Sequence, residues 1–230
     1  IVKRGNSGNY GLKPVVNIVP TVLNGINGFI NTSLLSKHVM VTAQQNGVIM
    51  ATTAPNASSG EFYLARLLPG NYDVVITADN NATAVVAAVP VASSTSTAVL
   101  STSAYPITLA SALFNPGVIS GTVILNPVNN AVVPYVTAKQ SFADGPSVSI
   151  KYQGGNLSDG SYALTLPTVA PQLATYSSSL PLVFTTQTNT VPGTGKYKVE
   201  ASATGYATQN IAAVNISLLS QSGVNFILVP

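Results

Sequence analysis

One stretch of this sequence occurs twice, and the repetition limits the fold more than any other feature of the chain. The two copies span residues 59–91 and 159–216. Each begins with Gly-x-Phe/Tyr-x-Leu and continues with Tyr-x-Val, a turn and an alternating apolar segment. From Tyr72, which aligns with Tyr197, the copies keep one register without a gap. Repeats at this distance indicate two copies of one domain.

The length supports the same division, because 230 residues exceed the usual size of a single domain. We expect a leader and an extra strand over residues 1–24, a first β-sandwich over residues 25–112 and a second over residues 113–230. The second sandwich carries an insertion, residues 168–193, which is rich in Ser, Thr and Pro. A long loop or an extra hairpin is expected there, and loops of this length are usually functional or mobile.

Period-2 alternation and β-branched residues predict short strands in both halves, and no segment sustains a helical period. The fold class predicted is therefore all-β. In the first half the expected strands are residues 28–32, 39–43, 48–52, 61–64, 72–78, 83–89 and 97–101, with a further short strand at 105–109. In the second half they are residues 118–125, 132–138, 148–152, 161–166, 196–203, 208–216 and 224–229.

The composition excludes several classes of function. Charged residues make up only 7% of the chain, and the net charge of +3 comes from nine scattered basic residues. No dense basic patch can follow a phosphate backbone, so nucleic acid is not an expected partner. Cysteine is absent, which excludes disulfides and thiolate metal sites. No apolar run approaches the roughly 18 residues of a membrane-spanning helix.

The amino end combines a Gly- and Asn-rich leader, residues 1–11, with a strand pattern at residues 12–23. The leader is expected to have no fold of its own. One face of the predicted strand carries its large apolar residues and two prolines, which cannot donate to a ladder. The members of this face are Leu12, Pro14, Val16, Ile18, Pro20 and Val22. The strand can pair as the first strand of its own sandwich, or it can add to the open sheet edge of another copy.

The repeated motifs resemble the carboxypeptidase regulatory-like repeat family. Residues 60–64 with 68–74 carry the resemblance in the first copy, and residues 160–164 with 197–199 and Gly205-Tyr206 carry it in the second. The resemblance implies two tandem Ig-like, transthyretin-like β-sandwiches preceded by an N-terminal extra strand. One departure is Asp79-Asn80-Asn81, which stands where the family usually has a Gly-aromatic turn.

The leader, the extra strand, the tandem sandwiches and the charge-poor surface together resemble the architecture of secreted donor-strand fibres, including archaeal threads and bundling pili. That resemblance implies a structural subunit of an extracellular filament, a homopolymer joined head to tail by strand addition. The alternative is a cell-surface adhesion or glycan-binding module that does not polymerise and makes contact through residues 168–193. Neither hypothesis requires a cofactor, and no enzyme motif is found.

Residues with catalytic or metal-binding chemistry are few. His38 is the only histidine, and no Gly-x-Ser-x-Gly elbow accompanies it, so we expect a structural or solvated role. Asp73, Asp79 and Asp159 could contribute to a calcium site, although turns use the same residue types. Lys198 or Lys151 with Asn225 and Glu200 has the composition of an isopeptide crosslink.

Two further sets concern sugars. Five asparagines begin Asn-x-Ser/Thr and are candidate glycan acceptors. These are Asn31, Asn56, Asn81, Asn156 and Asn215. Several tyrosines could form a sugar-binding platform, but at alternating strand positions a tyrosine more often seals a sandwich core. These are Tyr10, Tyr63, Tyr72, Tyr152, Tyr162 and Tyr206.

Overall fold

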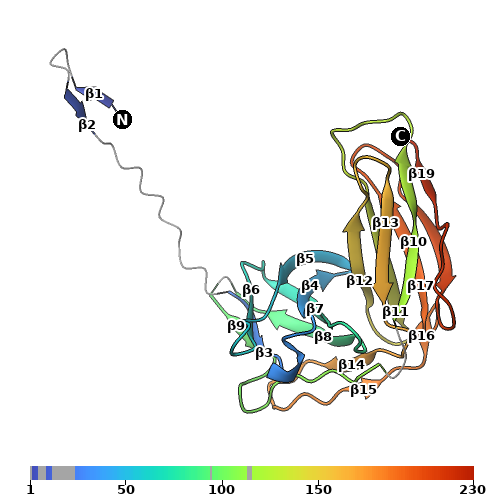
Figure 1. Cartoon of the computed structure of the whole chain (residues 1–230). Coiled ribbons are helices and arrows are strands. Elements are labelled where there is room, and N and C mark those ends of the chain that lie inside the picture. The colour runs from blue at the N-terminus through green and yellow to red at the C-terminus, as the bar shows by residue number, and fades with distance from the viewer. Residues whose placement is uncertain (1, 5–8, 12–23, 94, 113–115) are drawn as a thin grey trace.

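The computed structural model describes residues 2–4, 9–11, 24–93, 95–112 and 116–230, and nearly all regular structure in them is β-strand. The single exception among these residues is the short 3-10 helix η1 (Thr32–Leu34), which Asn31 caps by accepting a hydrogen bond from the Ser33 amide. Figure 1 shows two groups of strands set against each other at an angle. The all-β sandwich class predicted from the sequence is confirmed.

The first group, here called the N-terminal sandwich, consists of two packed sheets. One sheet has the order β6-β3-β9, and the other contains β8-β7-β4-β5. Their bounds are β3 (Gly25–Phe29), β4 (Met40–Gln45), β5 (Val48–Thr53), β6 (Glu61–Ala65), β7 (Gly70–Thr77), β8 (Ala84–Val91) and β9 (Thr97–Val99). The expected strand at 105–109 is reduced to isolated bridges at Tyr105 and Ile107.

The second group, the C-terminal sandwich, repeats this topology. Its sheets have the orders β13-β10-β19 and β12-β11-β17-β18, and β16 also pairs with β11. The bounds are β10 (Gly117–Leu125), β11 (Tyr135–Phe142), β12 (Ser147–Gly154), β13 (Ser161–Leu166), β16 (Thr190–Val191), β17 (Lys196–Ser202), β18 (Gln209–Asn215) and β19 (Phe226–Leu228). Residues 113–115 lie outside the described residues, so the boundary drawn there stays a prediction.

The duplication extends to register and irregularities. Ile26 pairs with Leu64 in the first sandwich, and Ile119 pairs with Leu164 in the second. The β7–β8 ladder shifts register between Tyr72 and Val74, and the β17–β18 ladder shifts between Tyr197 and Val199. Because a bulge bends a strand at one defined point, its repetition shows that the two copies share backbone shape as well as sequence.

A repeated turn explains why both copies contain glycine before the Phe/Tyr-x-Leu segment. Gly60 and Gly160 have φ angles of +74° and +71°, a conformation that L side chains rarely adopt. A Cβ at either position would also collide with a backbone oxygen, that of Ile30 or of Val123. Both turns are closed by an asparagine four residues earlier, whose carbonyl accepts the glycine amide. Sequence and sterics therefore fix this corner twice.

The leader contradicts the expectation that residues 1–11 have no fold. β1 (Val2–Arg4) pairs antiparallel with β2 (Asn9–Gly11), with Lys3 opposite Tyr10. The Gly and Asn content of the intervening sequence, which favoured a flexible leader, is equally typical of the turn in a hairpin.

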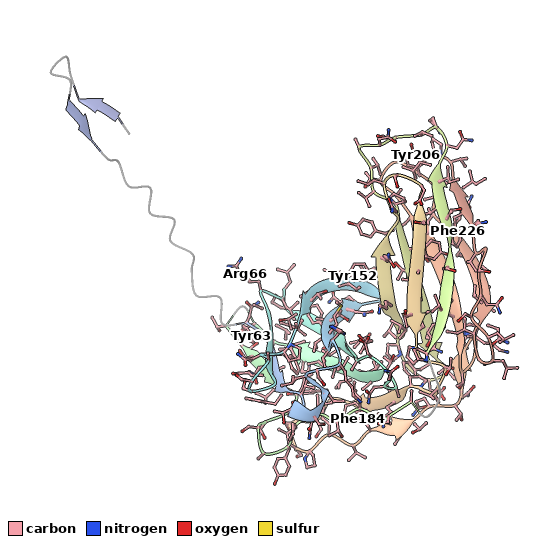
Figure 2. All side chains as sticks on the ribbon, viewed as in Figure 1. Tyr63, Arg66, Tyr152, Phe184, Tyr206 and Phe226 are labelled. Carbon is pink, nitrogen blue, oxygen red and sulfur yellow. The ribbon has the colours of Figure 1, made fainter. Side chains whose placement is uncertain are left out.

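The insertion is also placed differently from the prediction. β14 (Gln172–Thr175) runs parallel to β8 of the N-terminal sandwich, and β15 (Thr185–Thr186) pairs with β14 on the outside. The insertion therefore does form an extra hairpin-like pair, but this pair extends the sheet of the other sandwich to six strands. Partly buried Tyr176, Leu182 and Phe184 pack against the N-terminal core, and Figure 2 shows Phe184 beside that sandwich.

The two sandwiches share a buried junction. The Gln44 side chain on β4 exchanges two hydrogen bonds with the backbone of Ser149 on β12, at 2.7 and 2.8 Å. The Ser149 hydroxyl donates to the Gly47 carbonyl at 2.6 Å. Val75 and Val85, on the outer face of the first sandwich, belong to the core cluster of the second. The relative orientation of the sandwiches is therefore fixed by polar pairing and apolar burial together.

Candidate subunit interface

The residues predicted to form an interface strand are outside the part of the chain that the structure describes. All of Leu12, Pro14, Val16, Ile18, Pro20 and Val22 fall in the segment 12–23. The candidate interface is therefore developed from the sheet edges that could receive such a strand. In the larger sheet of each sandwich, these edges belong to β5 and β8 and to the equivalent strands β12 and β18.

Two of these edges meet at the junction between the sandwiches. β12 lies next to β5 and β7, as Figure 1 shows. A cleft of about 690 Å³ lies along this junction and includes Met40, Lys151 and Tyr152 in its lining. Figure 2 shows Tyr152 between the two sandwiches. These edges are therefore partly occupied by the chain's own second half.

The third edge, that of β8, is closed by β14. Gln172 pairs with Ala84 and Thr175 with Ala87, and the Gln172 amide donates to the Thr83 carbonyl at 2.8 Å. At the end of the ladder, the Tyr176 amide donates to the Ala87 carbonyl at 3.0 Å. The remainder of β8 contains Ala88 at φ +58° and Pro90, which lacks an amide hydrogen. A bulge and a proline both discourage further pairing at a sheet edge.

The fourth edge, that of β18, has no such cover in the part of the chain that the structure describes. β18 ends the sheet order β12-β11-β17-β18, on the side away from the junction. Its seven residues, QNIAAVN, contain neither a charge nor a proline. Ile211 is 38% exposed, whereas its counterpart Val86 under β14 is 0% exposed. A long uncharged edge with exposed apolar residues is the kind of strand that pairs with another chain.

The sequence analysis missed the closure of β8, although one signal pointed to it. Residues 84–92 form the longest apolar run of the chain. A continuous apolar run indicates a strand that is buried on both faces rather than one with a solvent side. Ala84, Val85 and Val86 are each 0% exposed, because the core covers one face, the C-terminal sandwich covers the other and β14 covers the edge.

The candidate glycan acceptors occupy different environments. Asn56, Asn156 and Asn215 are exposed, and each uses its side-chain oxygen to accept bonds from the serine two residues later. Asn31 is half-buried at the start of η1. Asn81 is only 2% exposed, and its amide nitrogen donates to the Leu109 and Ala110 carbonyls at 3.1 and 3.2 Å. The folded chain therefore offers no room for a glycan on Asn81.

The residues considered for catalysis, metal binding and crosslinking do not converge. His38 Nδ1 lies 2.6 Å from an Asp79 oxygen on the exposed surface. The carboxylates of Asp73 and Asp159 accept nearby backbone amides. Among the described residues, no group of three or more His, Cys, Asp or Glu side chains could hold a metal ion.

The crosslink candidates are likewise separated. Glu200 forms ion pairs with Lys139 and Lys198, both within its own sheet. Burial alone would raise the pKa of Glu200, but the hydrogen bond and charge of Lys139, aided by Lys198, hold it below its ordinary value. Asn225 instead accepts hydrogen bonds from Thr122 on β10, in the other sheet of the sandwich. Lys151 lies on β12 and lines the cleft.

The tyrosines do not gather into one platform either. Tyr72 and Tyr162 are buried, and their hydroxyls donate to the carbonyls of Leu68 and Val224. Tyr206 donates to the Pro127 carbonyl, and Tyr152 lines the cleft. Tyr63 is on β6, in the other sandwich from Tyr152 and Tyr206, and Tyr10 lies on β2, where only the backbone is described.

These features define an all-β protein of two joined sandwiches in which one sheet edge is closed by strand addition within the chain. No known family model and no curated protein matches the sequence. No helix among the described residues has the length and apolar character needed to cross a bilayer.

Three solved structures illustrate the fold-level likeness. The chain is similar to the Bacillus anthracis TIE protein, with 12% identity and a TM-score of 0.24 over 90% of this chain and 33% of that one. It is similar to a streptococcal ancillary pilin at 9% identity and TM-score 0.26, over 92% of this chain and 63% of that one. A mutant of the shaft pilin SpaA from Lactobacillus rhamnosus GG gives 11% and 0.22, over 90% and 98%. The chain thus spans about a third of the first and under two thirds of the second.

Proposed function

We propose that this protein is the structural subunit of an extracellular filament, assembled without covalent links by donation of the strand at residues 12–23 to a neighbouring copy. The observation that carries the proposal is that β3 to β9 complete both sheets of the N-terminal sandwich within residues 25–99. The apolar strand predicted before them is therefore surplus to that sandwich. A surplus strand that donates to the next subunit in an open head-to-tail series generates a filament.

The rest of the molecule suits this role. Gln44 and Ser149 lock the two sandwiches together, so each subunit can act as one rigid segment of a fibre. The surface of the chain carries few charges, and its 15 prolines and 18 glycines are concentrated in turns and strand ends as expected for sandwiches. We place the protein outside the cell or at its surface, where such a filament would serve a structural rather than a catalytic role.

The test is removal of the donor segment. Deleting residues 1–23 should leave folded sandwiches, because none of the sheets described for residues 25–228 uses them, and should abolish filaments. Deleting only residues 1–11 provides the matched control, because it removes the β1–β2 pair and keeps the proposed donor strand. Negative-stain microscopy and sedimentation measure assembly, and circular dichroism measures folding. Filaments that persist without residues 1–23 would refute strand donation.

A further inference from the structure

The edge of β18 differs from the edge of β8 in one respect, the presence of an added strand. The two strands occupy the same position in their sheets and share the register with their neighbours β17 and β7. In one sandwich residues 84–87 are covered by β14, and in the other the equivalent residues 209–212 pair only with β17 among the described strands. The fold thus contains a worked example of strand addition at a site that is left open in its duplicate.

We propose that β18 is the acceptor edge, and that it receives residues 15–19 of a second copy as a parallel strand. This inference rests on the proposed function and names the contact that the filament would use. The parallel direction follows from β14, which runs parallel to β8. Parallel and antiparallel additions expose different faces of the incoming strand, so the direction also decides which donor residues reach the core.

The sequence of the donor segment matches the demands of this edge. β14 is four residues long and begins directly after Pro171. Residues 15–19 likewise follow a proline, Pro14, and end before Pro20, so every residue between them has an amide hydrogen for the ladder. The window is uncharged, as is β18. Its length therefore suffices for the four pairs that residues 209–212 require.

The exposure of Ile211 indicates which donor face turns inward. Val86, the counterpart of Ile211, is paired with Ala174 of β14 and is fully buried. Ile211 is 38% exposed at the rim of its own core. Val16 and Ile18 share one face of the donor segment, and we place that face toward Ile211. Burial of these three side chains is the apolar contribution that accompanies the new backbone hydrogen bonds.

A charged edge residue tests the acceptor. Ile211→Lys should abolish filaments, because a lysine on an edge strand opposes pairing, and it should leave the monomer folded, since the side chain already reaches solvent. Ile227→Lys is the matched control: Ile227 is 55% exposed on β19, an edge strand of the other sheet of the same sandwich. Filaments should persist in this control.

The outcomes separate the two levels of the proposal. If deletion of residues 1–23 abolishes filaments while Ile211→Lys does not, β18 is not the acceptor and strand donation stands. If filaments survive the deletion, the proposed function itself fails. A dimer that survives the deletion but is lost in Ile211→Lys would mean that two β18 edges pair with each other, which overturns the named occupant.

Engineered cysteines decide the case in which Ile211→Lys is poorly folded. The chain contains no cysteine, so Val16→Cys combined with Ile211→Cys introduces one defined pair. Oxidation during assembly should give a ladder of covalent oligomers on a non-reducing gel. Val16→Cys with Met50→Cys, on the 50% exposed edge position of β5, should give none. A crosslinked monomer in the first variant would show that the strand lies on its own chain and would overturn the proposal.

Discussion

Two equivalent tyrosines show how single residues carry the repeated architecture. Tyr72 and Tyr197 are 2% and 1% exposed, and each hydroxyl donates to a backbone carbonyl upstream in sequence. The acceptor of Tyr72 is Leu68, four residues away, whereas the acceptor of Tyr197 is Pro167, 30 residues away. The insertion separates the partners in the second case, yet the contact is retained. Tyr197 therefore holds the start of the insertion against the core.

Buried tyrosines also predict how stability depends on alkaline pH. Burial raises the pKa of Tyr162 to about 12, above the ordinary value of 10.0. The neutral phenol is favoured in the folded state, so its contribution is complete below pH 10 and is lost as pH rises toward 12. Tyr162→Phe should cost about 1 kcal/mol at pH 7, through loss of the bond to the Val224 carbonyl.

The same variant should lose less stability than the native chain between pH 10 and pH 12. Urea unfolding at a series of pH values measures both effects. Tyr105→Phe is the control, because Tyr105 is 54% exposed. An equal alkaline slope in native chain and Tyr162→Phe would show that the phenol is not protected by burial.

At the scale of elements, β14 is the feature that distinguishes the two sandwiches. It contributes Ala174, which is 3% exposed beside Val86, and it converts an edge strand into an interior one. β18 keeps the ancestral edge and carries polar residues where β8 is apolar on its outer face: Asn210 stands where Val85 does. Strands of one repeat thus acquire different surfaces according to what covers them.

An aspartate in β14 should detach the insertion without unfolding the sandwiches. Ala174→Asp would bury a carboxylate without a partner, at a cost of about 3 kcal/mol, and release of β14 to solvent avoids that cost. Limited proteolysis should then cut within residues 168–193, while the core retains its circular dichroism spectrum. Ala212→Asp places the same side chain on the open edge and should change stability by less than about 0.5 kcal/mol. Protection of the insertion in Ala174→Asp would contradict the role assigned to β14.

For the whole molecule, the junction determines whether the sandwiches behave as one body. Gln44 is 0% exposed and satisfies both the amide and the carbonyl of Ser149. Its truncation leaves two buried backbone groups without partners, and each such group costs about 1 to 3 kcal/mol. The apolar contribution of Val75 and Val85 to the second core remains.

We therefore expect Gln44→Ala to weaken the junction by about 2 kcal/mol and to split thermal unfolding into two transitions. Differential scanning calorimetry detects the split, and small-angle scattering detects the wider range of angles between the sandwiches. Gln45→Ala is the control, because that side chain is half-buried and bonds only the Asn71 carbonyl within its own sandwich. A single transition in Gln44→Ala would mean that apolar burial alone holds the junction.

The sequence by itself determined the features that depend on local chemistry and spacing. Alternation located every strand of the two sandwiches, glycine at φ > 0 marked the repeated corner, and the repeat fixed the shared topology, because each of these is encoded by neighbouring residues. Only the tertiary structure decided the partners that lie far apart. β14 pairs with a strand of the other sandwich, and Gln44 meets Ser149, since such contacts depend on how two complete sheets pack. The open edge of β18 became recognisable only when its covered duplicate could be placed beside it.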